Sequence, residues 1–258
     1  MSTSTPHKIS FELIVESGRD WLEWIDAASK FETVVKSNID WSSLKGEESQ
    51  FVGRRLKTTP PPKQILLNAV YITMVAGFEE YLRASLKSIA AHLTGQKKAY
   101  AEFQKDLIRT NIREAARLLK RMDSPPDYLQ FNEDDLCQVL GSCTPGSNAV
   151  IFNGEALSEV EGLIRLKNFC DRAAALGKKI DLDQFGKDSK IKEALGQKSS
   201  SSTREVRKLL EAELTKIATF RNRVAHQGGS ASDVTDSILF AHRGLLCAVA
   251  DAVEIGLK

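Results

Sequence analysis

Apolar residues recur every three or four positions through most of the chain, which is the spacing of amphipathic α-helices. The pattern predicts helices around 11–25, over 63–93, over 100–122, from about 203 to 227, and over 233–255. A Pro60-Pro61-Pro62 run precedes the second of these helices, and Pro125-Pro126 follows the third. Strand signals are nearly absent and no internal repeat is visible. The sequence therefore predicts an all-α fold, most simply an up-and-down helical bundle.

Two local signals mark the ends of the helix that starts near residue 203. Ser202 and Glu205 match a capping box, in which a hydroxyl and a carboxylate satisfy the first free backbone N–H groups. Gly228 and Gly229 end the helix, because glycine accepts the left-handed conformation that follows a helix C-terminus.

The region 123–202 is less periodic, so we interpret it as an insertion that carries one or two helices. Residues 156–176 predict one helix, whereas a short strand at 149–152 would have no partner strand. The chain is thus expected to comprise an N-terminal helical segment and linker, 1–62, and a helical bundle, 63–258, with its insertion at about 123–202.

The composition is that of an ordinary globular protein and narrows the classes of partner. The 258 residues are 42% apolar and 27% charged, so the chain is able to bury a core. Its 36 Lys and Arg against 34 Asp and Glu give a net charge of +2, which excludes binding of nucleic acid by bulk positive charge. Contact with RNA would need a local basic patch.

Cysteine usage and hydropathy indicate a soluble protein of a reducing compartment. The four cysteines include no C-x-x-C pair, which argues against a disulfide framework or a cysteine-rich zinc site. Residues 1–8 lack the apolar core of a secretory signal, and the apolar stretch 65–78 is too short to cross a bilayer. We therefore expect a cytoplasmic protein without membrane contact, in which 65–78 forms a buried helix.

The segment 220–229, Phe-Arg-Asn-Arg-Val-Ala-His-Gln-Gly-Gly, carries the candidate chemistry at the end of a predicted helix. The planar guanidinium of Arg221 suits a phosphate, His226 exchanges a proton near neutral pH, and Asn222 offers a neutral donor and acceptor. These groups are suited to metal-free cleavage of RNA, in which the ribose 2′-hydroxyl is the nucleophile. The sequence contains no metal-ligand spacing and no phosphate loop, so no metal or cofactor is expected.

The motif Arg221-Asn222-x-x-Ala225-His226, followed by glycine, resembles the RN-xxx-H signature of the HEPN (higher eukaryote and prokaryote nucleotide-binding) superfamily. The run at 75–82, Val-Ala-Gly-Phe-Glu-Glu-Tyr-Leu, is similar to a helix of the RiboL-PSP type of HEPN protein, which carries an acidic residue. The resemblance is closest over about ten residues of the motif and extends more loosely over 63–93 and 203–255.

This resemblance implies a helical bundle with metal-independent endoribonuclease activity, in which the motifs of two chains form one composite cleft in a homodimer. Arg221 would hold the scissile phosphate, His226 would act as general base or acid, and Asn222 would orient the substrate or the imidazole. RNA would be cut to leave a 2′,3′-cyclic phosphate. Such enzymes serve as toxins or antiphage effectors, some under a regulatory partner protein, whereas other HEPN proteins are non-catalytic modules that bind RNA, nucleotides or proteins.

Each candidate residue also has a plain structural interpretation. Arg221 and His226 are able to cap the carbonyls at a helix C-terminus, and Asn222 is able to be a surface amide. Of Glu79 and Glu80, one is expected to face inward and to pair with Arg221 or with another arginine of the bundle. We favour Glu79 as this supporting residue.

A second candidate RNA-binding surface is a row of basic residues at four-residue spacing, which lie along one stripe of a helix. The row comprises Lys105, Arg109, Arg113, Arg117 and Arg121. We take Arg109, Arg113 and Arg117 as candidate RNA contacts, together with Arg223 in the motif. The alternative is a solvated face opposite the apolar residues of the same helix.

Overall fold

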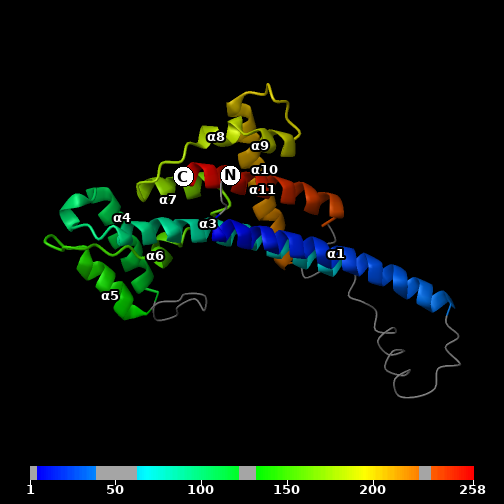
Figure 1. Cartoon of the computed structure of the whole chain (residues 1–258), viewed down its shortest axis with the longest axis horizontal. Helices are drawn as coiled ribbons and strands as arrows, with labels where there is room; N and C mark the ends of the chain where they lie inside the picture. The colour runs from blue at the N-terminus through cyan, green and yellow to red at the C-terminus, as the bar shows by residue number, and fades with distance from the viewer. Residues whose placement is uncertain (1–4, 39–62, 122–131, 227–233) are drawn as a thin grey trace, which may run out of the picture.

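The computed structural model describes residues 5–38, 63–121, 132–226 and 234–258, and all regular structure within these ranges is helical (Figure 1). These ranges contain ten α-helices, one 3₁₀ turn and no β-strand. The prediction of an all-α protein is therefore confirmed. The proline run at 60–62 and the predicted Gly228-Gly229 stop lie outside the described ranges.

Four long helices carry most of the core, and shorter helices lie between them along the chain. In order, the elements are α1 (Pro6–Asn38), α3 (Lys63–Gly95), the 3₁₀ turn η2 (Tyr100–Glu102), α4 (Lys105–Leu119), α5 (Glu133–Ser142), α6 (Gly154–Ser158), α7 (Leu166–Ala175), α8 (Leu182–Lys187), α9 (Ser189–Ala194), α10 (Thr203–His226) and α11 (Asp236–Leu257). The helices predicted over 63–93 and 233–255 are present as α3 and α11, with ends shifted by less than one turn.

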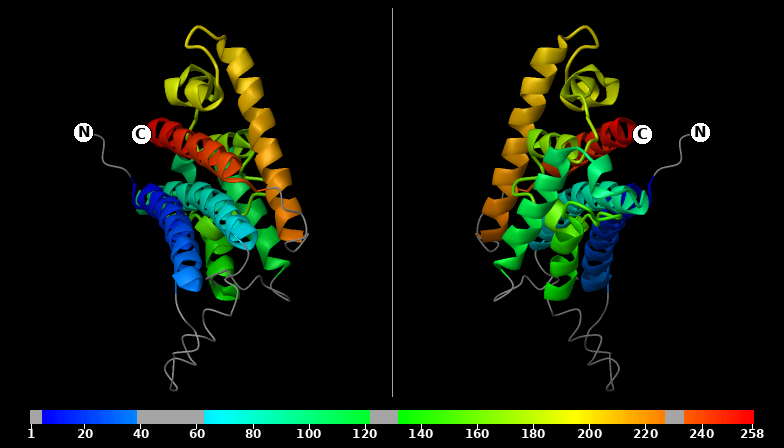
Figure 2. Two further views of the ribbon diagram at one scale, coloured as in Figure 1. Left: turned by 90° about the vertical axis from the view of Figure 1, so that its right-hand side faces the viewer. Right: turned by 90° about the vertical axis from the view of Figure 1, so that its left-hand side faces the viewer.

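α1, α3 and α11 run side by side along the long axis of the molecule, and α10 crosses them steeply (Figures 1 and 2). α3 is the central element, because it contacts α1, α6, α7, α10 and α11. Phe11 and Val15 of α1 belong to the same buried cluster as residues of α3, α10 and α11. The N-terminal helix therefore packs as part of one core.

The apolar stripe of α3 explains its central position. Tyr71, Val75, Phe78, Leu82 and Leu86 are completely buried, and their spacing of three or four residues places them along one side of the helix. Burial of each large apolar side chain contributes about 1.5–3 kcal/mol. α3 is thus held in place chiefly by its own apolar side chains.

α3 also has the length and apolar composition of a membrane span. The helix that contains 65–78 continues to Gly95, and Gln64–Gly95 has a mean hydropathy of 1.3 over its most apolar window. Half of that window is buried inside the protein, and the core helix of a soluble protein meets the same criteria. Burial of Leu67, Met74 and Phe78 agrees with the predicted role of 65–78 as a buried helix.

The helix predicted over 100–122 is divided in two. Phe103 and Gln104 are extended, with ψ angles of 151° and 135°, between η2 and α4. The Phe103 ring packs against Phe152, with the ring centroids 5.1 Å apart. This break accompanies a contact between segments far apart in the chain. Helical periodicity describes residues within one segment, so it does not signal such a contact.

The expectation of one or two helices in the insertion is wrong, because the described residues 132–202 contain the five helices α5–α9. Each is only five to ten residues long, which is too short for a periodic apolar pattern to develop. Side-chain caps start four of them: Asn132, Asn153, Asp181 and Asp188 each accept a hydrogen bond from a backbone N–H in the first turn.

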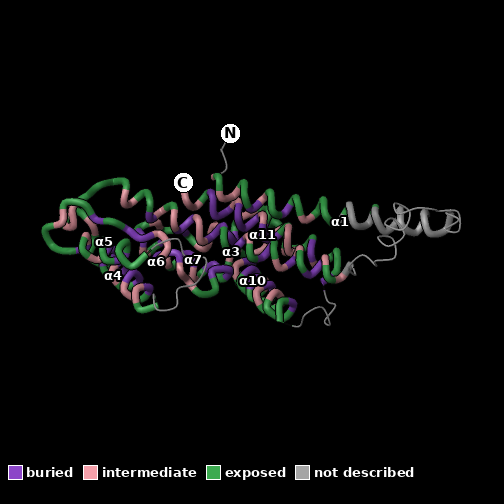
Figure 3. Tube along the Cα trace, turned by 90° about the horizontal axis from the view of Figure 1, so that it is seen from below, coloured by how far each residue is buried: buried purple, intermediate pink, exposed green. Residues whose placement is uncertain are grey.

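The expectation of a single helix over 156–176 is also wrong. The helix predicted over 156–176 is interrupted at 159–165, where Gly162 has a left-handed φ of +63°. Residues 149–152 form no strand; the backbone N–H of Val150 instead donates to the carbonyl of Lys98, at 3.1 Å. Buried residues nevertheless extend from α3 into α4, α6 and α7, so the insertion shares the interior of the molecule (Figure 3).

α10 begins where the capping signal predicts. The backbone N–H of Glu205 donates to the Ser202 hydroxyl, at 3.3 Å, and this hydroxyl donates to the Glu205 carboxylate, at 2.7 Å. The helix then buries Leu210, Leu214 and Ile217. This apolar face packs against α3 and α8 and brings the C-terminal end of α10 beside the middle of α3.

Candidate functional site

The last two turns of α10 position the motif residues. Ile217 and Val224 are buried on the inner face of the helix, and Arg221 lies between them along the chain, half-buried. Asn222 and His226 are exposed, and their four-residue spacing places them one turn apart on the outer side. The helix therefore directs Arg221 toward the bundle and leaves Asn222 and His226 at its surface.

Arg221 is held by Glu79 of α3. Its Nη2 atom donates to both carboxylate oxygens of Glu79, at 2.9 Å each, and the two side chains are only 27% and 21% exposed. Within the described ranges, the hydrogen bonds of the Arg221 guanidinium are made by Nη2, and its Nε atom is buried without a hydrogen-bond partner. The pair thus orients the guanidinium and leaves part of its donor fork for an anion.

Of the two neighbouring glutamates, Glu79 is the one that faces inward. The Glu80 side chain is 62% exposed and pairs with Arg83, with 3.2 Å between its Oε2 atom and Nε of the arginine. Arg221 bonds to Glu79 and to no carbonyl at the described end of α10, which argues against a C-capping role for this arginine.

Arg221 and Asn222 lie at the wall of a groove of about 670 Å³ between α3, α10 and the segment that joins α6 to α7. This Arg221 groove is lined by Glu79, Arg83, residues 159–165, Asn168, Ala218, Arg221 and Asn222. Its charged side chains are three arginines and three glutamates, so the formal charges cancel. A phosphate in the groove would be held by individual guanidinium contacts and not by bulk charge.

His226 is exposed at the C-terminal end of α10 and does not belong to the wall of the Arg221 groove. Its imidazole makes no hydrogen bond to the part of the chain that the structure describes. Within one chain, the structure therefore brings Arg221 and Asn222 to the groove and leaves His226 outside it, one turn further along the helix.

The basic row of α4 is tied to an acidic partner. Arg113 and Arg117 both pair with Glu114, which is only 5% exposed, at distances of 3.1 and 3.3 Å. Arg172 of α7 reaches the same carboxylate at 3.1 Å. Arg117 also donates to the backbone carbonyl of Glu159, at 2.6 Å. These arginines fasten α4 to α7 and to the segment that follows α6.

The other candidate RNA contacts are more accessible. The Arg109 side chain is 77% exposed and lies 3.6 Å from Asp106 on the same helix. The guanidinium of Arg223 stacks on the ring of Phe220, 4.8 Å from its centroid. None of Arg109, Arg113 and Arg117 lines the Arg221 groove, so the structure does not bring the basic row together with the motif.

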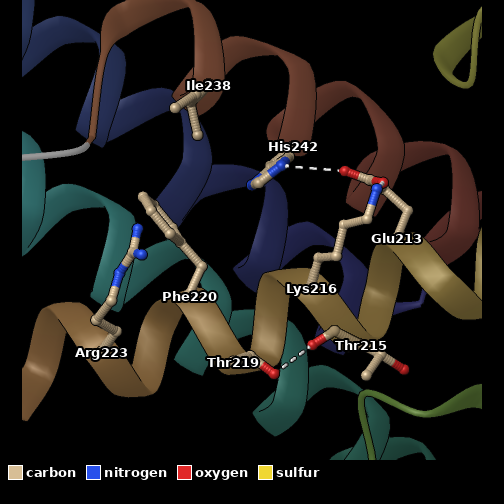
Figure 4. Close-up of a pocket in the computed structure, with 8 residues that line it drawn as sticks. All are labelled: Glu213, Thr215, Lys216, Thr219, Phe220, Arg223, Ile238 and His242. Atoms are coloured by element: carbon tan, nitrogen blue, oxygen red, sulfur yellow. Dashed lines mark hydrogen bonds and ion pairs between the residues drawn. The ribbon is translucent and has the colours of Figure 1, made fainter.

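A second pocket, which the sequence did not indicate, lies on the flank of α10 opposite to the Arg221 groove. Figure 4 shows the residues that line it. This His242 pocket has a volume of about 410 Å³ and is lined by Glu213, Thr215, Lys216, Thr219, Phe220, Arg223, Ile238 and His242. Its members come from α10 and α11, so the pocket exists only where these two helices meet.

Two polar residues of the His242 pocket, Glu213 and His242, form a chain of contacts that ends at the hydroxyl of the buried Tyr71 in α3. Nδ1 of His242 lies 2.8 Å from the Tyr71 hydroxyl, and Nε2 lies 3.5 Å from Oε1 of Glu213. Burial lowers the pKa of His242 from its usual 6.5, and Glu213 only partly opposes this; burial also raises the pKa of Tyr71. Tyr71 and His242 are 171 positions apart, so no local spacing signals their contact.

The Glu79–Arg221 contact joins the run at 75–82 to the motif at 221–226. Within the described ranges, no group of three or more His, Cys, Asp or Glu side chains is placed to hold a metal ion. Comparison of the chain with protein-family models, with curated protein sequences and with solved structures found no match.

Proposed function

We propose that this chain is a metal-independent endoribonuclease of the HEPN type that acts as a homodimer. The observation that supports this most directly is the Glu79–Arg221 pair at the wall of the Arg221 groove, because it joins the two segments that resemble HEPN proteins. Asn222 lines the same groove, and His226 follows one turn later. A guanidinium, an amide and an imidazole therefore occupy the last two turns of one helix.

The proposed reaction needs no metal, because RNA carries its own nucleophile. The ribose 2′-oxygen attacks the adjacent phosphorus, the P–O5′ bond breaks, and the products are a 2′,3′-cyclic phosphate and a 5′-hydroxyl. A general base takes the proton of the 2′-hydroxyl, and a general acid gives a proton to the departing O5′. Arg221 stabilises the negative charge that develops on the phosphate oxygens.

The requirement for both a base and an acid favours a homodimer. One chain supplies one motif imidazole, and a second copy brings a second His226 to the same phosphodiester, one neutral and the other protonated. Support for this comes from the exposed position of His226, outside the wall of its own groove, where a partner chain can reach it. We propose a cytoplasmic role as a toxin or antiphage effector, controlled by a regulatory partner protein.

A non-catalytic module that binds RNA or a nucleotide is the second candidate. The charge of Arg221 is already matched by Glu79, and the formal charges in the Arg221 groove cancel. Such a site is suited to recognising a phosphate without changing it. In that case Arg221 and Asn222 hold the ligand and His226 transfers no proton.

Cleavage of RNA by the purified chain in the presence of EDTA tests the proposal. We expect cleavage to persist in EDTA and the 3′ ends to carry a 2′,3′-cyclic phosphate. Arg221→Ala and His226→Ala are each expected to lower the rate by at least about 100-fold. Lys208→Ala, which changes an exposed cation of the same helix, is the matched control and is expected to leave the rate unchanged.

Two results would overturn the assignment. Tight binding of RNA without cleavage, unaffected by His226→Ala, would establish the second candidate. Undiminished cleavage by the double variant Arg221→Ala, His226→Ala would show that the catalytic site lies elsewhere in the molecule.

A further inference from the structure

We propose that the His242 pocket holds one base of the RNA strand whose phosphate lies at Arg221, and that it selects guanine. The inference rests on the proposed function for its substrate class, and it adds a specificity site that the resemblance to HEPN proteins does not supply. Its volume of about 410 Å³ lies within the range of small-molecule sites and accommodates a nucleobase.

The position of the pocket relative to the motif is the first argument. Lys216, Phe220 and Arg223 recur at a helical spacing on one flank of α10, whereas Ala218, Arg221 and Asn222 lie on the other. The Arg221 groove and the His242 pocket are therefore separated by the width of one helix. A strand that crosses the exposed end of α10, at Asn222 and His226, reaches both.

The pocket offers a stacking surface, which is the second argument. Phe220 lies between Arg223 and His242 (Figure 4), and its ring packs edge-on against Tyr71, with the centroids 5.1 Å apart and the planes at 89°. The Arg223 guanidinium covers this ring at 4.8 Å. A planar guanidinium supported by an aromatic ring is a surface on which proteins stack unpaired RNA bases.

The third argument is the orientation of the polar side chains of His242 and Glu213, which line the pocket. The Glu213 carboxylate only accepts hydrogen bonds, so a neutral His242 that faces it with Nε2 carries its single proton on that atom, and Nδ1 then accepts from the Tyr71 hydroxyl. Lys216 binds the other carboxylate oxygen, Oε2, at 2.8 Å. The Glu213 carboxylate is thus held in one orientation in the pocket, between two donors.

A fixed carboxylate selects bases by their donors. Each carboxylate oxygen accepts more than one hydrogen bond, so Glu213 retains acceptor capacity beside its contacts with His242 and Lys216. Guanine presents two adjacent donors on its Watson–Crick edge, N1–H and the N2 amino group, which one carboxylate accepts together. Uracil presents a single N–H between two carbonyl oxygens, which a carboxylate repels.

Nucleotide binding to the full-length His226→Ala protein tests the inference without any contribution from cleavage. The probes are GMP and UMP, and the readout is the NMR signals of the His242 ring. We expect GMP to shift these signals and to bind at least about tenfold more tightly than UMP. Thr219→Trp, which fills the rim of the pocket, is expected to abolish the shifts; Lys208→Trp is the matched control on the same helix.

Glu213→Gln is the second variant, because it keeps the size of the side chain and removes the charge. It is expected to reduce the preference for GMP over UMP to less than about threefold. Equal affinity of the unmodified pocket for the two nucleotides, or GMP shifts that persist in Thr219→Trp, would overturn the inference.

The same measurements separate this inference from the proposed function. Guanine-selective binding at His242 in a protein that cleaves no RNA would support the pocket and oppose the nuclease. Cleavage of RNA with a base preference that Glu213→Gln and Thr219→Trp leave unchanged would support the nuclease and overturn the pocket.

Discussion

A guanidinium that binds a phosphate must be held in place and must still have donors to offer. Arg221 meets both conditions, because Glu79 bonds to Nη2 alone and does so from a different helix. Both side chains are largely shielded from water, so their attraction is less screened than that of a surface pair. Glu79 is therefore a positioning residue, which acts on a phosphate only through Arg221.

Glu79→Gln tests this positioning role. The amide retains the shape of the carboxylate but loses its charge, so the bond to Nη2 weakens and Arg221 is less well oriented. We expect the rate of RNA cleavage to fall by about tenfold or more, with KM for RNA changed much less than kcat. Glu80→Gln is the matched control on the exposed neighbour, and an equal loss in both variants would contradict the role.

His242 predicts a pH dependence of stability. Burial lowers its pKa in the folded chain below the usual 6.5, so on acidification the unfolded chain takes up this proton first. The contribution of His242 is therefore fully present above pH 6.5 and is lost as pH falls through the lower, folded-state pKa. The slope from one such group is at most about 1.4 kcal/mol per pH unit.

Urea unfolding of the protein and of His242→Gln, measured between pH 8 and pH 5, isolates this contribution. The free energy of unfolding of the unmodified protein should decline more steeply below pH 6.5 than that of the variant. Parallel curves for the two proteins would show that His242 takes up its proton equally in the folded and unfolded chains.

At the scale of elements, the short helix α8 braces the start of α10. Arg207 of α10 bonds to Asp183 of α8, at 2.9 Å, and α8 also packs against α10 through Gly186. A Cβ atom at Gly186 would lie 2.4 Å from the backbone carbonyl oxygen of Thr203, the first residue of α10. This close approach sets the distance between the two helices.

Gly186→Ala is therefore expected to destabilise the protein. Overpacking against a backbone atom costs about 1–3 kcal/mol, because one helix must move. Gly141→Ala in α5 is the matched control: its added Cβ meets nothing within 4 Å, and the change from glycine in a helix is expected to stabilise by about 0.5–1 kcal/mol. Chemical unfolding of both variants measures the difference, and equal stabilities would contradict the packing argument.

At the scale of the molecule, α3 joins the functional features into one body. Glu79 on this helix holds Arg221, and Tyr71 on the same helix holds His242. Both flanks of α10 are therefore linked to the same buried helix, and this keeps the Arg221 groove and the His242 pocket at a constant separation.

The proposed composite site predicts that subunits interfere with one another. Addition of excess His226→Ala protein to the unmodified protein should form mixed dimers, each of which lacks one imidazole of the composite cleft. We expect RNA cleavage to fall in proportion to the fraction of mixed dimers, measured by sedimentation of differently labelled chains. Cleavage that is unaffected by the added variant would mean that each chain acts alone.

The helical class, the course of α3 and the start of α10 were predictable because they depend on neighbours within a few positions. An apolar stripe needs only the local period, and the Ser202–Glu205 cap needs only residues three apart. The motif at 221–226 was equally visible, since its members share one helix end.

Contacts between distant segments decided the rest. The break at Phe103 accompanies its packing on Phe152, and Glu114, which neutralises part of the basic row of α4, also pairs with Arg172 of α7. The pairing of Glu79 with Arg221 was one of several open alternatives, and the Tyr71–His242 contact had no signal at all. Local spacing defines which residues share a face of a helix, whereas the packing of separate helices determines which faces meet.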